Sequence, residues 1–295
     1  MNSLLHNEMF MGVIAILVHI TFPVIVFVIA SNMKFNDINR EIRRPWLLLK
    51  TFIVACIMIP LMTAGIVKIL AVPLLLGGLL LIASVTAGDP FDVVEAKGKK
   101  GNITLSSITM LFLVLVMPFT IHFWLWIFSQ WFPLSLSVSP WPLFATVAPI
   151  TMVPLLVGIM FNKLLPSLTK ILRPALEWFI KISLGIQILI FIVPAMKAMF
   201  TFSIASFVAI FIVTTLSLLA GYYAGGGANR KDRISIATTS ALGNLAAIML
   251  VAHLSYPKVH VWFTLLAYVV LRWLVFMLWY LFLRVRLHLR GEKLE

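Results

Sequence analysis

Charge is scarce in this chain, and acidic residues are rarer than basic ones. Only 10 of the 295 residues are Asp or Glu, and charged residues of both signs make up 11%. A soluble globular domain carries roughly 25%, so this composition excludes an ordinary soluble domain. The chain has one cysteine, Cys56, which excludes a disulfide within the chain and a metal site built from several cysteines.

Long apolar runs take the place of the missing charge. Hydrophobic residues make up 62% of the chain, and the mean hydropathy is +1.07. A helix needs about 20 apolar residues to cross a bilayer, so the pattern predicts an all-α polytopic membrane protein with nine transmembrane helices. The predicted spans are Phe10–Ala30, Trp46–Leu70, Val72–Ala96, Ile103–Phe128, Phe144–Leu165, Pro174–Met196, Phe200–Tyr223, Ile234–Leu254 and Val259–Leu283.

The basic residues indicate how the chain is oriented in the membrane. The net charge of +13 does not indicate nucleic-acid binding, because these residues lie in short loops and form no continuous face. They gather in alternate loops, and such loops face the cytoplasm. We therefore expect an integral protein of the plasma or inner membrane with residues 230–233 and the C-terminus inside, and residues 131–141 and the N-terminus outside. A signal peptide is the alternative for the first span, but the leader MNSLLHNE has no Lys or Arg.

Two of the predicted spans, the third and the eighth, are interrupted by polar residues. The third contains Asp89-Pro90 and the eighth contains Gly243-Asn244. Lipid tolerates a broken helix only where the freed backbone is buried in protein or lines a cavity. Paired broken helices in two halves of a chain indicate the midplane site of a transporter. We expect each helix to break within about three residues of Asp89 or Gly243, and the two breaks to approach each other.

Asp89 and Asp92 fit two compatible roles. Asp is a favoured N-cap and Pro a favoured first helical residue, so Asp89 is expected to begin the second half of the third span. Asp92 would then lie in the first turn, where the helix dipole favours negative charge. Ionisable residues at membrane depth also indicate function. Because a capping carboxylate keeps free lone pairs, both residues are candidates for binding a coupling cation or proton.

Hydroxyl and amide side chains mark the eighth span. Thr238 is a candidate ligand of the coupling ion, and Thr239, Ser240 and Asn244 are candidates for substrate binding. Hydroxyls and freed carbonyls can ligate a hard cation or hydrogen-bond a solute. The alternative is that these side chains bond back to their own helix or pack between helices. Asn244 is also expected to cap the second half of this span.

Arg272 stands alone in the middle of the ninth span, too far from either end to snorkel easily. We therefore expect its guanidinium to have a partner. The candidates are Asp89, Asp92, a row of helix-end carbonyls and an anionic substrate. Because an anionic substrate is one of these possible partners, Arg272 is a further candidate for substrate binding. The sequence contains no HExxH, GxSxG or P-loop motif, which makes an enzyme the weakest class.

Four segments, in this order, resemble the bile acid:sodium symporter family. They are NMKFNDINREIRRPWLLL (Asn32–Leu49), GNITLSS (Gly101–Ser107), MVPLLVGIMFNKLLP (Met152–Pro166) and IATTSALGNLAAIMLVAH (Ile236–His253). The resemblance implies one transmembrane transporter domain over residues 1–295. Its core, residues 46–128 and 200–286, would be an inverted repeat whose two broken helices cross. Its panel would comprise residues 8–31 and 143–197.

The resemblance also implies changes at the sodium sites of the family. Four positions where the family has Gln, Glu, Gln and Asn fall here on Ala55, Ala237, Ala241 and Leu242. The Ser-Asn pair of the first crossover falls on Asp89-Pro90 or Asp92-Val93, and Ser106 is retained as a candidate ion ligand. Alanine supplies no ligand oxygen, and a hard cation needs several. At most one sodium site is predicted.

Together these patterns predict a secondary active transporter of a small organic anion that works by alternating access. The coupling ion is sodium or a proton, and no other cofactor is expected. The expected partners are the organic anion and the lipid bilayer. Two alternatives are an uncoupled channel or facilitator on the same scaffold, and a membrane binding or sensor protein that does not transport.

Overall fold

The computed structural model describes residues 8–133, 139–225, 229–241, 243–256 and 261–289, and this part of the chain is helical apart from connections and one isolated β-bridge. The first seven elements are α2 (Glu8–Ala30), α3 (Phe35–Ile42), α4 (Pro45–Ile53), the π-helix η1 (Val54–Met58), α5 (Ile59–Ile69), α6 (Leu74–Val85) and α7 (Pro90–Gly98). They are followed by α8 (Ile103–Trp131), α9 (Pro140–Leu164), α10 (Pro166–Met199), α11 (Ile204–Ala224), α12 (Arg230–Ala241), α13 (Leu245–Ser255) and α14 (Val261–Leu289).

Six helices of the described residues are long and apolar enough to cross a membrane. They are Pro45–Ile69, Ile103–Trp131, Trp141–Leu164, Pro166–Met199, Ile204–Ala224 and Val261–Val285. Three shorter apolar helices are His19–Ala30, Leu74–Val85 and Leu245–Ser255. The last two are halves of the predicted third and eighth spans, and a half-helix of 11 or 12 residues is too short to cross a bilayer by itself.

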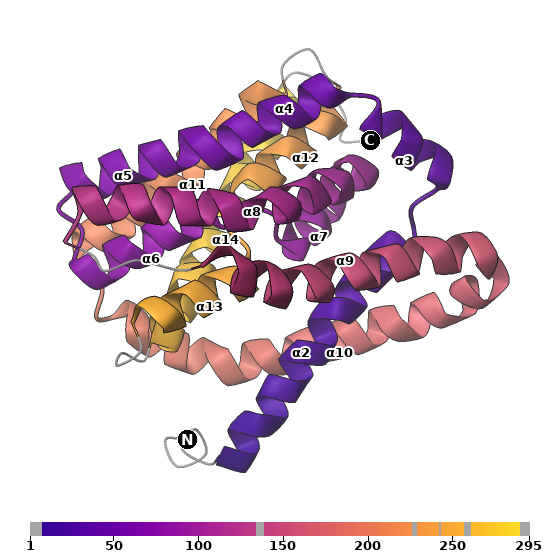
Figure 1. Ribbon diagram of the computed structural model, residues 1–295, viewed down its shortest axis with the longest axis horizontal. Helices are drawn as coiled ribbons and strands as arrows, with labels where there is room; N and C mark the ends of the chain where they lie inside the picture. Colours follow the sequence, from indigo (N-terminus) through magenta and orange to yellow (C-terminus); the bar gives the residue numbers. More distant parts are fainter. Residues whose placement is uncertain (1–7, 134–138, 226–228, 242, 257–260, 290–295) are drawn as a thin grey trace.

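The long helices form two groups (Figure 1). Helices α2, α9 and α10 form one group, in which α2 packs against both of the others, and α10 also packs against α14 of the other group. Helices α4 to α8 and α11 to α14 make up the rest of the bundle. A large apolar core of buried residues, including Leu80, Met117 and Ile248, runs through the second group and reaches Ile25 of α2.

Both predicted helix breaks are confirmed. The third span stops at Val85 and resumes at Pro90, so Asp89 stands at the start of the second half as expected. The eighth span is interrupted between Ala241 and Leu245, next to Gly243.

Two predictions about the regular helices were wrong. Pro174 does not begin the sixth span, because α10 starts at Pro166 and continues through Pro174. Both prolines carry the same start signal, and membrane helices accommodate an internal proline. The connection after the first span was expected to be a loop, but it contains the helix α3. This helix has only eight residues and is too polar to resemble a span.

The second span contains a π-helical turn, η1, that the sequence pattern did not predict. Pro60 has no N–H, so the usual donor to the carbonyl of Cys56 is missing. The indole Nε1 of Trp124 donates to this carbonyl instead, at 2.7 Å. Ala55 and Cys56 pack with Ala87 in one buried cluster, which places the irregular turn beside the first helix break.

Candidate functional site at the crossing of two broken helices

The two helix breaks meet backbone to backbone. Ala87 and Gly243 form an isolated antiparallel β-bridge, and the amide of Asn244 donates to the carbonyl of Thr86. The side chain of Asn244 also donates to the carbonyl of Gly88, at 2.9 Å. Carbonyl and N–H groups freed by the breaks are therefore paired with each other inside the protein, as burial requires.

Glycine permits this close approach at two positions. A Cβ on Gly243 would collide with the carbonyl of Ala83 and lie 2.8 Å from Oγ1 of Thr86. Gly88 has a φ of +92°, which is in the left-handed region that favours glycine. A larger residue at Gly243 would push the two breaks apart, and one at Gly88 would press on Met110 and Val114 of α8.

Asp89 caps the second half of both broken helices. Its Oδ1 accepts the N–H of Phe91 in α7 at 2.9 Å, and its Oδ2 accepts the N–H of Leu245 in α13 at 2.9 Å. Asp92 returns a bond, because its Oδ2 accepts the N–H of Asp89 at 3.2 Å, which completes a capping box. Asn244 caps α13 as predicted, with its Oδ1 accepting the N–H of Ala247 at 3.1 Å. The carboxylate of Asp89 thus ties the two broken helices together.

Arg272 reaches this crossing from α14. Its side chain is 5% exposed, and its Nη1 donates to the carbonyl of Gly243 at 3.4 Å. The guanidinium lies 5.4 Å from the centre of the Tyr268 ring, one turn earlier on α14. Its charge attracts both Asp89 and Asp92. A carbonyl at a helix break, which was one of the expected partners, is therefore the group that Arg272 contacts directly.

Four buried oxygens near the crossing have no hydrogen-bond partner within the described part of the chain. They are Oδ1 of Asp92, Oγ of Ser106, Oγ1 of Thr109 and Oγ of Ser240. The residues are at most 4% exposed and lie on α7, α8 and α12, which pack against one another. Because buried polar groups are nearly always paired, these oxygens are available to a bound ion or to water.

Thr109 was missed by the sequence reasoning. It lies three residues after Ser106, so the two hydroxyls share one face of α8. The spacing of three residues is visible in the sequence, but it indicates a shared site only when α7 is seen to pack against α8.

The remaining predicted site residues are buried, with their polar groups already engaged. Thr238 donates to the carbonyls of Ile234 and Ser235, and Thr239 donates to that of Ser235 at 2.7 Å. This is the back-bonded geometry that the sequence left as an alternative. The amide and carbonyl groups of the Asn244 side chain both bond within the crossing. These hydroxyl and carbonyl oxygens keep lone pairs, and the Nδ2 group of Asn244 has a second N–H besides the one donated to Gly88.

The positions at which oxygen-bearing side chains were expected to be lost are apolar and enclosed. Ala55 and Ala237 are 1% and 0% exposed, and Ala241 packs in an apolar cluster with Ala237. Leu242 lies outside the described residues. Within those residues no group of three or more His, Cys, Asp or Glu could hold a metal ion, so a cation at the crossing would depend on hydroxyl and single carboxylate oxygens.

Comparison with known proteins identifies a family for this chain. Residues 16–206, about two thirds of the chain, match the profile of the family described as the Sodium Bile acid symporter family. None of the individual curated proteins compared with the chain matches it. Members of this family are membrane transporters and not enzymes. The described helices and the family profile therefore agree, and the chain belongs to the sodium bile acid symporter family.

Proposed function

We propose that this protein is a secondary active transporter of a small organic anion, and that one cation is coupled to each transport cycle. The observation that carries the proposal is the crossing itself, in which Asp89, Thr86 and Gly88 join the break of one helix to that of another. Discontinuous helices of this kind form the substrate and ion sites of secondary transporters.

The order of the helices supports the proposal of an inverted repeat with nine crossings. A continuous span, a broken span and a continuous span occur as α4–α5, α6–α7 and α8, and again as α11, α12–α13 and α14. We assign these two units to the core, residues 46–128 and 200–286. Helices α2, α9 and α10 would form the panel, and alternating access would arise from movement of one group against the other.

Charge at the crossing supports coupling between a cation and an anion. With Asp89 and Asp92 ionised and Arg272 protonated, the formal charge of these three groups is −1, which repels an anion. A sodium ion or proton bound at Asp92 would bring this sum to zero. Arg272 and the N-terminal ends of α7 and α13 would then attract an anionic group. The cation would therefore bind first and permit the organic anion to follow.

One cation site accounts for the unpaired oxygens. Oδ1 of Asp92, Oγ of Ser106 and Oγ1 of Thr109 would ligate the ion from α7 and α8, and Ser240 would add an oxygen from α12. Hard cations take several oxygen ligands, and this set offers one carboxylate oxygen and three hydroxyls. Asp89 has a different role in this proposal, because both of its oxygens already cap helices.

Uptake into proteoliposomes tests the proposal. A bile acid is the first probe, since that substrate describes the family, followed by smaller organic anions. Uptake is measured against sodium at fixed pH and against pH at fixed sodium, in wild type and in Asp92→Asn. We expect dependence on one of the two cations with a Hill coefficient near one, and loss of that dependence in Asp92→Asn.

Three results would contradict the proposal in different ways. Uptake that is insensitive to both cations would favour a facilitator on the same scaffold. Thermal stabilisation by an anion without uptake would favour a binding or sensor protein. Sodium dependence with a Hill coefficient near two, unchanged in Asp92→Asn, would show that the ion site lies elsewhere. Asp37→Asn is the matched control, because this carboxylate is partly exposed and pairs with Arg40 within α3, away from the crossing.

A further inference from the structure

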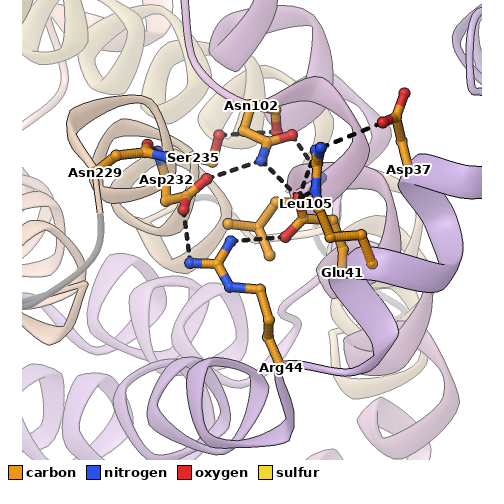
Figure 2. Close-up of polar contacts among 9 residues, drawn as sticks. Asp37, Glu41, Arg44, Asn102, Leu105, Asn229, Asp232 and Ser235 are labelled. Carbon is orange, nitrogen blue, oxygen red and sulfur yellow. Dashed lines mark hydrogen bonds and ion pairs between the residues drawn. The ribbon is translucent and has the colours of Figure 1, made fainter.

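A second polar cluster lies where α3 meets the beginnings of α4, α8 and α12 (Figure 2). Arg44 bridges two carboxylates, donating from Nη1 to Glu41 at 2.8 Å and from Nη2 to Asp232 at 2.7 Å. Glu41 is 1% exposed and Asp232 is 0% exposed. The hydrogen bond to Asp232 raises the pKa of Arg44, and so does the bond to Glu41. Arg44 therefore joins the two buried carboxylates, while Arg40 supplies a second guanidinium to Glu41, with Nη2 donating to Oε1 at 3.0 Å.

Asn102 completes this cluster. Its Nδ2 donates to Glu41 at 3.1 Å and to Asp232 at 2.8 Å, while its Oδ1 caps α8 through the N–H of Leu105. Its carbonyl accepts the hydroxyl of Ser235 in α12, at 2.9 Å. We refer to Glu41, Arg44, Asn102 and Asp232 as the clamp. The clamp fixes α3 to the two helices that lead into and out of the crossing region.

The chain immediately before α3 is fixed to a different set of helices. The carbonyl of Ser31 accepts from Arg173 of α10 at 3.3 Å, and the carbonyl of Met33 accepts from Asn162 of α9 at 3.0 Å. The end of α2 is thus held to α9 and α10, which are the other two helices of the proposed panel. Between these two sets of bonds, Lys34 has an extended backbone with φ −90° and ψ 138°.

A cavity of about 390 Å³ lies beside this connection. Its lining includes Asn32 and Met33, which follow α2, Asp37 and Arg40 of α3, and Gly101 and Asn102 at the start of α8. Side chains of the two groups are therefore not tightly packed at this level, and the space permits them to approach or separate.

We propose that Lys34 is the hinge between panel and core at this end of the molecule, and that the clamp residues are positioning residues that hold α3 rigidly on the core. The inference rests on the proposed alternating access. Hydrogen bonds hold the chain to the panel before Lys34 and to the core after it, so the change in backbone angles is confined to one or two residues. Helix α3 therefore moves with the core, and the end of α2 moves with the panel. Loss of the clamp would let α3 detach, which spreads the movement over the whole segment.

Distances between spin labels in nanodiscs test this inference independently of transport. The labels are attached in a Cys56→Ala background at three exposed positions, through Asn39→Cys in α3, Lys231→Cys in α12 and Lys170→Cys in α10. Distances are recorded without ligand, with saturating sodium, and with sodium plus a bile acid. We expect the 39–231 distance to be narrow and constant, while the 39–170 and 170–231 distances change together.

Clamp variants provide the second part of the experiment. Arg44→Gln and Asp232→Asn should each broaden the 39–231 distribution, because each removes the ion pair between Arg44 and Asp232. Arg44→Lys should restore part of the narrow distribution. Arg43→Gln is the matched control at an exposed neighbouring arginine, and it should change nothing. In uptake assays the clamp variants should lower the maximal rate and leave the KM unchanged.

The possible failures are distinguishable. A narrow 39–231 distance in Arg44→Gln would overturn the role of the clamp. A 39–170 distance that stays fixed while 170–231 changes would show that α3 travels with the panel, which overturns the hinge. If 170–231 does not change under any condition, the panel and core do not move, and the proposed alternating access fails together with the hinge.

Discussion

Asp89 and Leu245 are 156 residues apart in sequence and joined by one hydrogen bond of 2.9 Å, from the amide of Leu245 to Oδ2 of Asp89. The other oxygen of the same carboxylate caps α7. A single side chain thus serves as the N-terminal cap of two helices in different halves of the chain. This relationship separates Asp89 from Asp92, which has one oxygen without a partner among the described residues.

Asp89→Ala should destabilise the protein more than the loss of an ordinary cap. Losing the cap of α7 costs about 1 kcal/mol, and losing the acceptor of the Leu245 N–H costs about 1 kcal/mol more. The free energy of unfolding should therefore fall by about 2 kcal/mol, although Asn244 still caps α13. Asp89→Asn keeps one acceptor and should cost about half as much. The measurement is the unfolding midpoint in detergent, with Asp37→Asn as control. Equal midpoints for Asp89→Ala and wild type would show that the double cap does not contribute.

Ser106→Ala and Thr109→Val should separate ion binding from folding. Their hydroxyls have no partner in the described structure, so without sodium the substitutions should leave the unfolding midpoint unchanged or slightly raised. With sodium, wild type should be stabilised by linkage and the variants should gain less. Ser107→Ala is the control, because its hydroxyl bonds to the carbonyl of Ile103 at 2.9 Å. A sodium-induced shift of full size in both variants would remove these residues from the ion site.

Gly221→Ala should disrupt the packing of α11 on α12. A Cβ there would lie 2.7 Å from Cα of Ala237 and 2.8 Å from the carbonyl of Ile236, and such overpacking costs about 1–3 kcal/mol. Gly65→Ala provides the contrast, since a Cβ at that helical position meets nothing within 4 Å. It should stabilise the protein by about 0.4–1 kcal/mol. Thermal unfolding of both variants checks the signs, and a stabilised Gly221→Ala would contradict this packing.

Trp124→Phe should destabilise the second span at its π-helical turn. The substitution removes the Nε1 donor and leaves the buried carbonyl of Cys56 without it, which costs about 1–3 kcal/mol. Pro60→Ala supplies a backbone N–H that can donate to the carbonyl of Cys56 in place of the indole. The double variant should therefore be more stable than Trp124→Phe alone, as measured by a double-mutant cycle of unfolding. Additive effects would mean that Trp124 and Pro60 do not act on the same carbonyl.

Single-cysteine labelling should establish the orientation in the membrane. Cys56 is buried, so Cys56→Ala gives a background without thiols. In sealed cells, Lys231→Cys should react only after permeabilisation, whereas Trp131→Cys should react with an impermeant reagent from outside. Labelling of position 231 in intact cells would reverse the proposed topology.

The sequence predicted those features that depend on local chemistry. Asp89-Pro90 and Gly243-Asn244 carry cap and break signals in neighbouring residues, and both breaks occur where those signals lie. The start of α10 was misplaced because Pro166 and Pro174 carry the same local signal. The second bond of Asp89, to Leu245, has no local signature, since it exists only after two distant segments pack. The clamp was missed for the same reason, because Glu41 and Asp232 look like loop or surface residues until folding buries them.

The bond between Asn244 and Thr86 has a consequence for biosynthesis. When the first broken span enters the membrane, neither Asn244 nor Leu245 has been synthesised, so the carbonyls of Thr86 and Gly88 and one oxygen of Asp89 lack their donors. Such groups cannot face lipid unpaired. Until the eighth span is made, these groups must therefore be hydrogen-bonded by water or shielded from lipid by the insertion machinery or by neighbouring helices. The eighth span then supplies the N–H donors of Asn244 and Leu245.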